Sequence, residues 1–112
     1  MVVGNWIVRN QATIDVLSDI TDAVGDKLEV YVDGGIRNGT DVLKALALGA
    51  WAVFIGRPVL YGLACNGEEG VKAVLRILRE EFIRAMTLMG CSRLSDVSRC
   101  LLVSRSDLLS KL

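Results

Sequence analysis

Apolar residues in the first half of the chain follow two alternating patterns. In residues 11–24 and 42–48 they recur every three or four positions, which is typical of an amphipathic helix. Residues 28–32 and 51–55 are short runs rich in β-branched and aromatic side chains with glycines nearby, which is typical of buried strands. The order helix, strand, helix, strand predicts β/α units with a parallel sheet, and hence an α/β fold.

The second half of the chain is predicted to be mainly helical. A short helix is expected at 59–64, and the pair Asn66-Gly67 should end it. Residues 68–89 then carry apolar side chains at helical spacing, and one more short helix is expected at 95–102. We expect the apolar stripe of the long helix to pack into the core; it comprises Val71, Val74, Leu75, Leu78, Phe82, Ala85, Met86 and Met89.

The composition is that of one globular domain with a restricted chemistry. The 112 residues are 52% apolar and 23% charged, with 13 basic residues, 13 acidic residues and no histidine. Zero net charge argues against a general nucleic-acid binder, and no apolar run reaches the ~18 residues that a membrane span needs. Without histidine the chain cannot build a Ser-His-Asp system, a His-ligated zinc site or an imidazole base. No pair of carboxylates is placed for acid–base catalysis either, and we predict no metal site and no catalytic residue in the chain.

The three cysteines, Cys65, Cys91 and Cys100, are widely spaced and odd in number. This pattern favours neither a disulfide framework nor a zinc site. We expect them to be reduced and mostly buried as small apolar side chains, which weakly favours a reducing compartment.

Two loops of glycine and arginine follow the predicted strands. In a barrel of β/α units, ligands bind at the carboxyl ends of the strands, and phosphate often binds between neighbouring loops. Glycine lets backbone N–H groups approach an oxyanion, a helix that starts at Pro58 presents free N–H groups, and arginine adds a permanent forked charge. The loops therefore predict a phosphate site made by Asp33, Gly34, Gly35, Ile36, Arg37, Gly56 and Arg57.

The loops also allow other interpretations. Asp33 cannot attract phosphate, so we expect it to bind hydroxyls, such as those of a ribityl chain, or to orient Arg37. Alternatively, the glycines only form turns and Arg57 is only a surface charge. Tyr61 and Trp51 are expected to be packing aromatics rather than catalytic groups.

The chain ends in Ser110, Lys111 and Leu112, and S-K-L at the carboxyl end is a peroxisomal targeting signal. It predicts a peroxisomal import receptor as partner and requires an unstructured tail, for which we expect residues 104–112. The alternative is a solvated tail that ends in these residues by chance.

Residues 12–103 resemble the FMN-dependent 2-hydroxyacid oxidase family, which includes the peroxisomal glycolate oxidases and long-chain 2-hydroxyacid oxidases. The resemblance rests on VDGGIRNG, on GRPVLYGLA and on EEFIRAMTLMGCSRLSDVSRCLLV, and it is greatest for the long-chain members. The first two motifs also occur in part in phosphate-binding barrels of the inosine-monophosphate dehydrogenase type, which remain an alternative.

The resemblance implies a fold, a cofactor and a reaction. The family fold is a TIM barrel, and this chain would form its C-terminal portion, with two parallel strands and flanking helices. The family oxidises (S)-2-hydroxy acids to 2-oxo acids with FMN and O2 and releases H2O2. By the resemblance, the DGG-x-R and G-R residues named above would bind the phosphate and ribityl end of FMN. The resemblance also allows a homo-oligomer, although the sequence does not give the oligomeric state.

One part of the family pattern is missing from the sequence. A histidine base and a substrate-binding arginine lie in an S-x-H-G-G-R-Q-like motif of the family, where this chain has MVVGNWIVRNQ. A TIM barrel takes ~250 residues, so 112 residues cannot close one. We expect the chain to correspond to about the last third of a family member and to be inactive alone. The alternative is a non-catalytic polypeptide that only binds FMN or partners.

Overall fold

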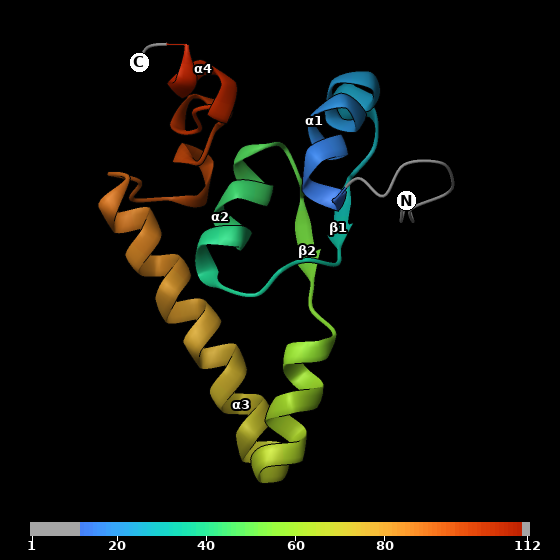
Figure 1. The fold of residues 1–112 in the computed structure, drawn as a ribbon, viewed down its shortest axis with the longest axis vertical. Coiled ribbons are helices and arrows are strands. Elements are labelled where there is room, and N and C mark those ends of the chain that lie inside the picture. Colours follow the sequence, from blue (N-terminus) through green and yellow to red (C-terminus); the bar gives the residue numbers. More distant parts are fainter. Residues whose placement is uncertain (1–11, 111–112) are drawn as a thin grey trace.

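The computed structural model describes residues 12–110 (Figure 1). Helices and strands alternate in the first half, and helical segments fill the second half, as the sequence predicts. The elements are α1 (Thr13–Val24), η1 (Gly25–Lys27), β1 (Tyr31–Asp33), α2 (Gly39–Ala47), β2 (Ala52–Phe54), α3 (Arg57–Leu88), η2 (Leu94–Asp96), η3 (Arg99–Leu101) and α4 (Arg105–Leu109).

The two strands pair in parallel, which confirms the predicted sheet. Tyr31 pairs with Ala52, and the register continues to Asp33 and Phe54. Each strand is shorter than its apolar run, because the ladder joins only three residues of each strand. Trp51 extends the contact by donating its backbone N–H to the carbonyl of Val30 at 2.7 Å. In the described part of the chain the sheet is open, with two strands.

The core lies between this sheet and helices α1 and α2. Its buried members are apolar side chains from α1, both strand regions and α2: Leu17, Val30, Val32, Ile36, Ala45 and Ala50. Partly buried Ile14, Ile20, Val42, Leu48, Val53 and Ile55 pack around them. Burial of this apolar surface is the main force that holds each helix on its strand.

Helix α3 folds back on itself in a V below the sheet (Figure 1). The backbone leaves helical geometry at Asn66 and Gly67, where the sequence predicts the break, and Gly67 has φ 55°. The two limbs touch through Gly62 and Gly70: a Cβ on Gly62 would lie 2.7 Å from the carbonyl oxygen of Gly70. Only glycine at both positions lets the limbs approach this closely.

The apolar stripe of the second limb of α3 is not part of the core, contrary to the prediction. Its members are half-buried or, for Leu75 and Met89, exposed. Helix α2 and the first limb of α3 pack against the second limb, and they cover only part of its apolar face. Helical periodicity identified the face correctly, but it did not indicate how much of the face this chain can cover.

Residues 95–102 do not form the predicted helix; two 3₁₀ turns, η2 and η3, replace it. The carboxylate of Asp96 accepts the backbone N–H groups of Arg93 at 2.9 Å and Ser92 at 3.1 Å, and the Ser92 hydroxyl at 3.0 Å. The Arg93 N–H and the Ser92 hydroxyl hold the pKa of Asp96 below its ordinary value. These local bonds offer the backbone an alternative to a continuous helix.

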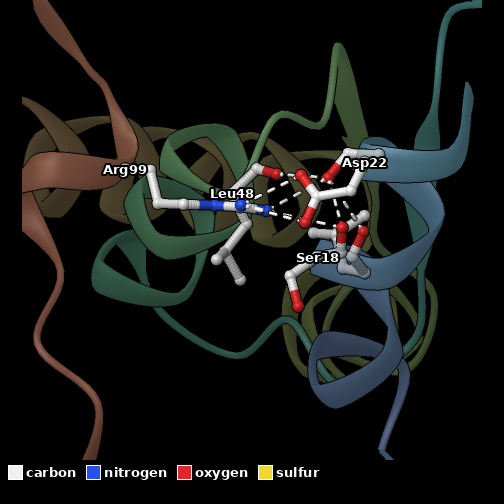
Figure 2. Close-up of polar contacts among 6 residues, drawn as sticks. Ser18, Asp22, Leu48 and Arg99 are labelled. Carbon is white, nitrogen blue, oxygen red and sulfur yellow. Dashed lines mark hydrogen bonds and ion pairs between the residues drawn. The ribbon is translucent and has the colours of Figure 1, made fainter. Parts of the chain in front are cut away.

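Arg99 in η3 attaches the C-terminal segment to α1 (Figure 2). Its Nη1 donates to both carboxylate oxygens of Asp22, at 2.9 and 3.1 Å, and its Nη2 donates to the Ser18 carbonyl at 3.4 Å. The Thr21 hydroxyl then reaches the Leu48 carbonyl at 2.9 Å, so α1, the end of α2 and the C-terminal segment meet here. The ion pair is half exposed, so its expected contribution to stability is modest.

The prediction of an unstructured tail is wrong for part of it, because residues 105–109 form the short helix α4. Backbone N–H groups of Asp107 and Leu108 donate to the Ser104 carbonyl, and the Ser110 hydroxyl donates to the Asp107 carbonyl at 2.9 Å. Ser110 itself is described, whereas Lys111 and Leu112 of the expected targeting signal lie outside the described residues.

The cysteines are free, as predicted, but two of the three are exposed. Cys91 is buried, whereas Cys65 lies at the exposed turn of α3 and Cys100 on the exposed η3. The expectation of mostly buried cysteines is therefore wrong, because the segments that carry Cys65 and Cys100 lie at the surface.

No helix within residues 12–110 combines the length and apolarity that crossing a membrane requires.

Candidate functional site

The first candidate loop follows β1 and turns sharply at two glycines. Gly34 and Gly35 have φ of 93° and 80°, a conformation that other residues adopt only with strain. Ile36 is buried in the core and fixes the loop, and Arg37 emerges exposed from the next position. At the start of the loop, the Thr13 hydroxyl donates to the Asp33 carbonyl at 3.2 Å and ties the end of β1 to α1.

The second candidate loop joins β2 to α3. Gly56 is the N-cap of α3 and has no side chain that could accept from the first turn. The Val59 N–H donates to the Gly56 carbonyl at 3.0 Å and Pro58 has no N–H, so within residues 12–110 the Arg57 N–H is the first-turn donor left open to an external acceptor. Arg57 is the first helical residue, and proline follows it at a position where the missing N–H costs nothing. The loop thus presents a helix N-terminus and a guanidinium group together.

The parallel pairing of β1 and β2 brings both loops to the same edge of the sheet. There they enclose a cavity of about 600 Å³. All seven residues predicted for the phosphate site line it, namely Asp33, Gly34, Gly35, Ile36, Arg37, Gly56 and Arg57. The structure therefore brings the predicted residues together, and FMN binding by them stays a prediction.

The cavity carries two guanidinium groups and one carboxylate. Neither the guanidinium of Arg37 nor that of Arg57 forms an ion pair or hydrogen bond within residues 12–110, so both are free to bind an anion. Within residues 12–110 the side chains of Asp33 and Arg37 form no hydrogen bond with each other. The structure therefore does not support the idea that Asp33 orients Arg37. The donor set, two permanent cations and backbone N–H groups at glycines, fits a phosphate dianion.

Sequence reasoning missed part of the cavity wall. Phe54, Ile55, Pro58 and Tyr61 also line the cavity. Tyr61 is exposed, so it is not the packing aromatic that was predicted. Its position four residues after Arg57 places the two side chains on one face of α3, and this spacing was the signal that could have found it.

Trp51 is also exposed, but it lies outside the cavity lining and makes an edge contact with Tyr31, the ring centroids being 5.7 Å apart. The hydrogen bond from Tyr31 to the Glu29 carboxylate raises the pKa of the phenol above its ordinary value.

Within residues 12–110 no group of three or more cysteine or carboxylate side chains could hold a metal ion.

A cavity between glycine- and arginine-containing loops at the carboxyl ends of parallel strands has the position of a ligand site in a β/α barrel. A family model described as FMN-dependent dehydrogenase matches residues 4–104. The chain belongs to this FMN-dependent dehydrogenase family. The match identifies the family that the sequence resembles and does not favour the inosine-monophosphate dehydrogenase alternative.

Individual relatives agree with the family. The chain is 58% identical to 2-hydroxyacid oxidase 2 of Rattus norvegicus over 95 residues, which are 85% of this chain and 27% of that protein. It is 55% identical to 2-hydroxyacid oxidase 1 of Homo sapiens over 101 residues, 90% of this chain and 27% of that protein. The chain therefore spans about a quarter of the length of these curated relatives.

A solved structure supports the fold. A mandelate oxidase variant with a monooxide FMN adduct superposes with a TM-score of 0.73 at 51% sequence identity. The superposition covers 77% of this chain and 27% of that one. The fold is therefore a portion of the TIM barrel of this FMN family, with two neighbouring β/α units, as the resemblance implies.

Proposed function

We propose that this chain supplies the phosphate end of the FMN site of an (S)-2-hydroxyacid oxidase. The observation that carries the proposal is the single cavity lined by both glycine and arginine loops. Arg37 and Arg57 bind the phosphate oxygens through their guanidinium groups, together with the backbone N–H groups of Gly34, Gly35 and Arg57. Asp33 accepts hydrogen bonds from ribityl hydroxyls at the mouth of the same cavity.

The cofactor supplies the redox chemistry when it is bound. A 2-hydroxy acid gives up two electrons and two protons to become a 2-oxo acid, and O2 takes them up as H2O2. The residues of this chain hold the cofactor and orient it, and the chain contains no histidine that could supply the imidazole base implied by the family resemblance. We therefore expect no H2O2 release from the purified chain with glycolate or a long-chain 2-hydroxy acid.

The phosphate assignment is tested by comparing FMN with riboflavin, which lacks the phosphate. Quenching of flavin fluorescence gives the Kd of each for the chain. Wild-type chain should prefer FMN, and Arg57→Ala should weaken FMN binding about 10- to 100-fold, the loss of a charge-assisted hydrogen bond, while riboflavin binding is unchanged.

Arg76→Ala is the matched control, because Arg76 is an exposed arginine on the second limb of α3 and does not line the cavity. It should leave both Kd values unchanged. Equal affinity of the wild-type chain for FMN and riboflavin would contradict a phosphate site in this cavity.

We also propose that the protein is directed to peroxisomes by Ser110, Lys111 and Leu112. The signal stands directly after α4, at the end of the chain. A fluorescent protein fused in front of this chain should enter peroxisomes, and deletion of Leu112 should leave it in the cytosol. Peroxisomal import of the deletion variant would contradict the assignment.

A further inference from the structure

The start of α2 directly follows the first candidate loop, and its N–H groups are bound from within the chain. The side chain of Asn38 accepts the N–H of Asp41 at 2.9 Å, and the carboxylate of Asp41 accepts the N–H of Arg37 at 3.1 Å. The N–H of Gly39 donates to Oε2 of Glu81 at 2.8 Å. The N-terminus of α2 is thus capped by side chains of the protein itself, whereas at the start of α3 the N–H of Arg57, a residue that lines the cavity, has no partner within residues 12–110.

Glu81 reaches this position from the second limb of α3, 42 residues further along the chain. The approach is backbone to backbone. A Cβ on Gly39 would lie 2.5 Å from the carbonyl carbon of Glu81 and closer still to the backbone nitrogen of Phe82. The backbones of α2 and α3 therefore pack directly against each other at Gly39, the first residue of α2, and no side chain larger than that of glycine fits there.

The fold of α3 explains why this contact bears on the site. The helix starts with Arg57 in one candidate loop, turns back at Asn66 and Gly67, and brings Glu81 to the end of the other loop. Helix α3 therefore carries both Arg57, which lines the cavity, and Glu81, which binds the backbone N–H of Gly39 at the end of the first candidate loop. Glu81 itself does not line the cavity, and its charge is directed to the Gly39 N–H.

We infer that Glu81 is a positioning residue for the phosphate loop. By accepting the Gly39 N–H it fixes the start of α2 against α3, and so sets the placement of Gly34, Gly35 and Arg37 opposite Arg57. The inference rests on the proposed FMN site. A carboxylate at the N-terminus of α2 also uses the favourable end of that helix dipole, which leaves the N-terminus of α3 for the ligand.

The test compares FMN and riboflavin binding in four forms of the chain. Glu81→Ala should weaken FMN binding about tenfold and change riboflavin binding less than about twofold. The residues that Glu81 places, Gly34, Gly35 and Arg37, contact the phosphate, whereas Asp33, which binds the ribityl chain, is held separately in β1 and by Thr13 of α1. Glu81→Gln keeps an acceptor oxygen at the same reach and should restore FMN binding to within about twofold of wild type. Glu80→Ala, at the exposed neighbouring position, should behave as wild type.

A second measurement reports on the loop without any flavin. The backbone amides of Gly34 and Gly35 should become more mobile in Glu81→Ala, as lower ¹⁵N order parameters, and return to wild-type values in Glu81→Gln. Glu81→Asp is too short to reach Gly39 but keeps the charge, so it should behave as the alanine variant. It provides the same test with less lost packing if Glu81→Ala does not fold.

The outcomes separate the two claims. A wild-type chain that binds FMN no better than riboflavin contradicts the proposed phosphate site, whatever the loop amides do. A wild-type preference for FMN that persists in Glu81→Ala and Glu81→Asp, or equal losses for FMN and riboflavin, overturns the positioning role alone. Failure of Glu81→Gln to restore FMN binding also overturns it.

Discussion

The two faces of the sheet differ sharply in what covers them. On the side of α1 and α2, Leu17 is 2% exposed and Val32 is 1% exposed. Around the other face, Tyr31 contacts Phe54 with ring centroids 6.0 Å apart, yet Phe54 is 51% exposed and Trp51 is 65% exposed. Both faces carry apolar side chains, but within residues 12–110 only one face has helices packed against it.

The comparison teaches how much of its core a pair of β/α units can build. A helix that follows its own strand returns to cover one face of it, so this layer needs only local segments. The other face of a TIM barrel is covered by side chains from the remaining strands, and the described residues contain two strands. The exposed aromatic face is therefore the inner side of a barrel wall.

The largest effect is expected from truncation on the covered face. Leu17→Ala should lower the free energy of unfolding by about 2–5 kcal/mol, because it leaves a cavity among well-packed neighbours. Phe54→Ala, on the open face, should cost no more than about 1.5 kcal/mol, mainly its contact with Tyr31. Urea unfolding followed by circular dichroism measures both, and equal losses would contradict the contrast between the faces.

A smaller effect on stability is expected in the loop that follows β1, at the edge of the sheet. Gly35→Ala should lower the stability by about 1–2 kcal/mol, because Gly35 has a positive φ that alanine adopts only with strain. Glu80→Ala is the control: it places alanine at an exposed position of helix α3, where the helical backbone suits it. Thermal unfolding of the two variants compares them, and an equal or greater loss in Glu80→Ala would refute the reasoning.

The smallest effect is expected far from both faces, at Asp96. Its pKa lies below the ordinary 3.8, chiefly through the Arg93 N–H, so the folded chain binds the proton less tightly than the unfolded chain. Its contribution to stability is complete above the unfolded pKa and is lost as the pH falls through the lower, folded value.

The stability difference between wild type and Asp96→Asn should therefore be constant near neutral pH and shrink as the pH falls below about 4. Thermal unfolding of both forms between neutral pH and pH 2.5 checks this. A difference that stays constant over the whole range would show that the Asp96 carboxylate is not held by these bonds.

Several features of the site were predictable because they depend on neighbouring residues. The glycine pair after the first strand and the break at Asn66 and Gly67 are found as predicted, and the helix predicted to start at Pro58 starts one residue earlier, at Arg57. Two parallel strands followed by such loops also required that the loops meet at one edge. Local chemistry and strand direction were sufficient for this part of the site.

Other features were not predictable because they depend on residues distant in sequence. The bond from Gly39 to Glu81 spans 42 residues and exists only because α3 turns back. The close contact of Gly62 and Gly70 gave no signal beyond two glycines in a helix. The exposure of Cys65 and Cys100 depends in the same way on where their segments lie.

The sequence by itself determined where α1, α2, α3 and the two strands form, which face of each helix is apolar, and which glycines and arginines stand at the strand ends. These follow from side-chain periodicity and backbone preferences within a few residues. Only the tertiary structure decided which apolar faces are covered, which N–H groups are already bound, and which side chains share one cavity. These depend on the packing of segments far apart in the chain, because burial and hydrogen bonding are properties of the whole arrangement and not of any single segment.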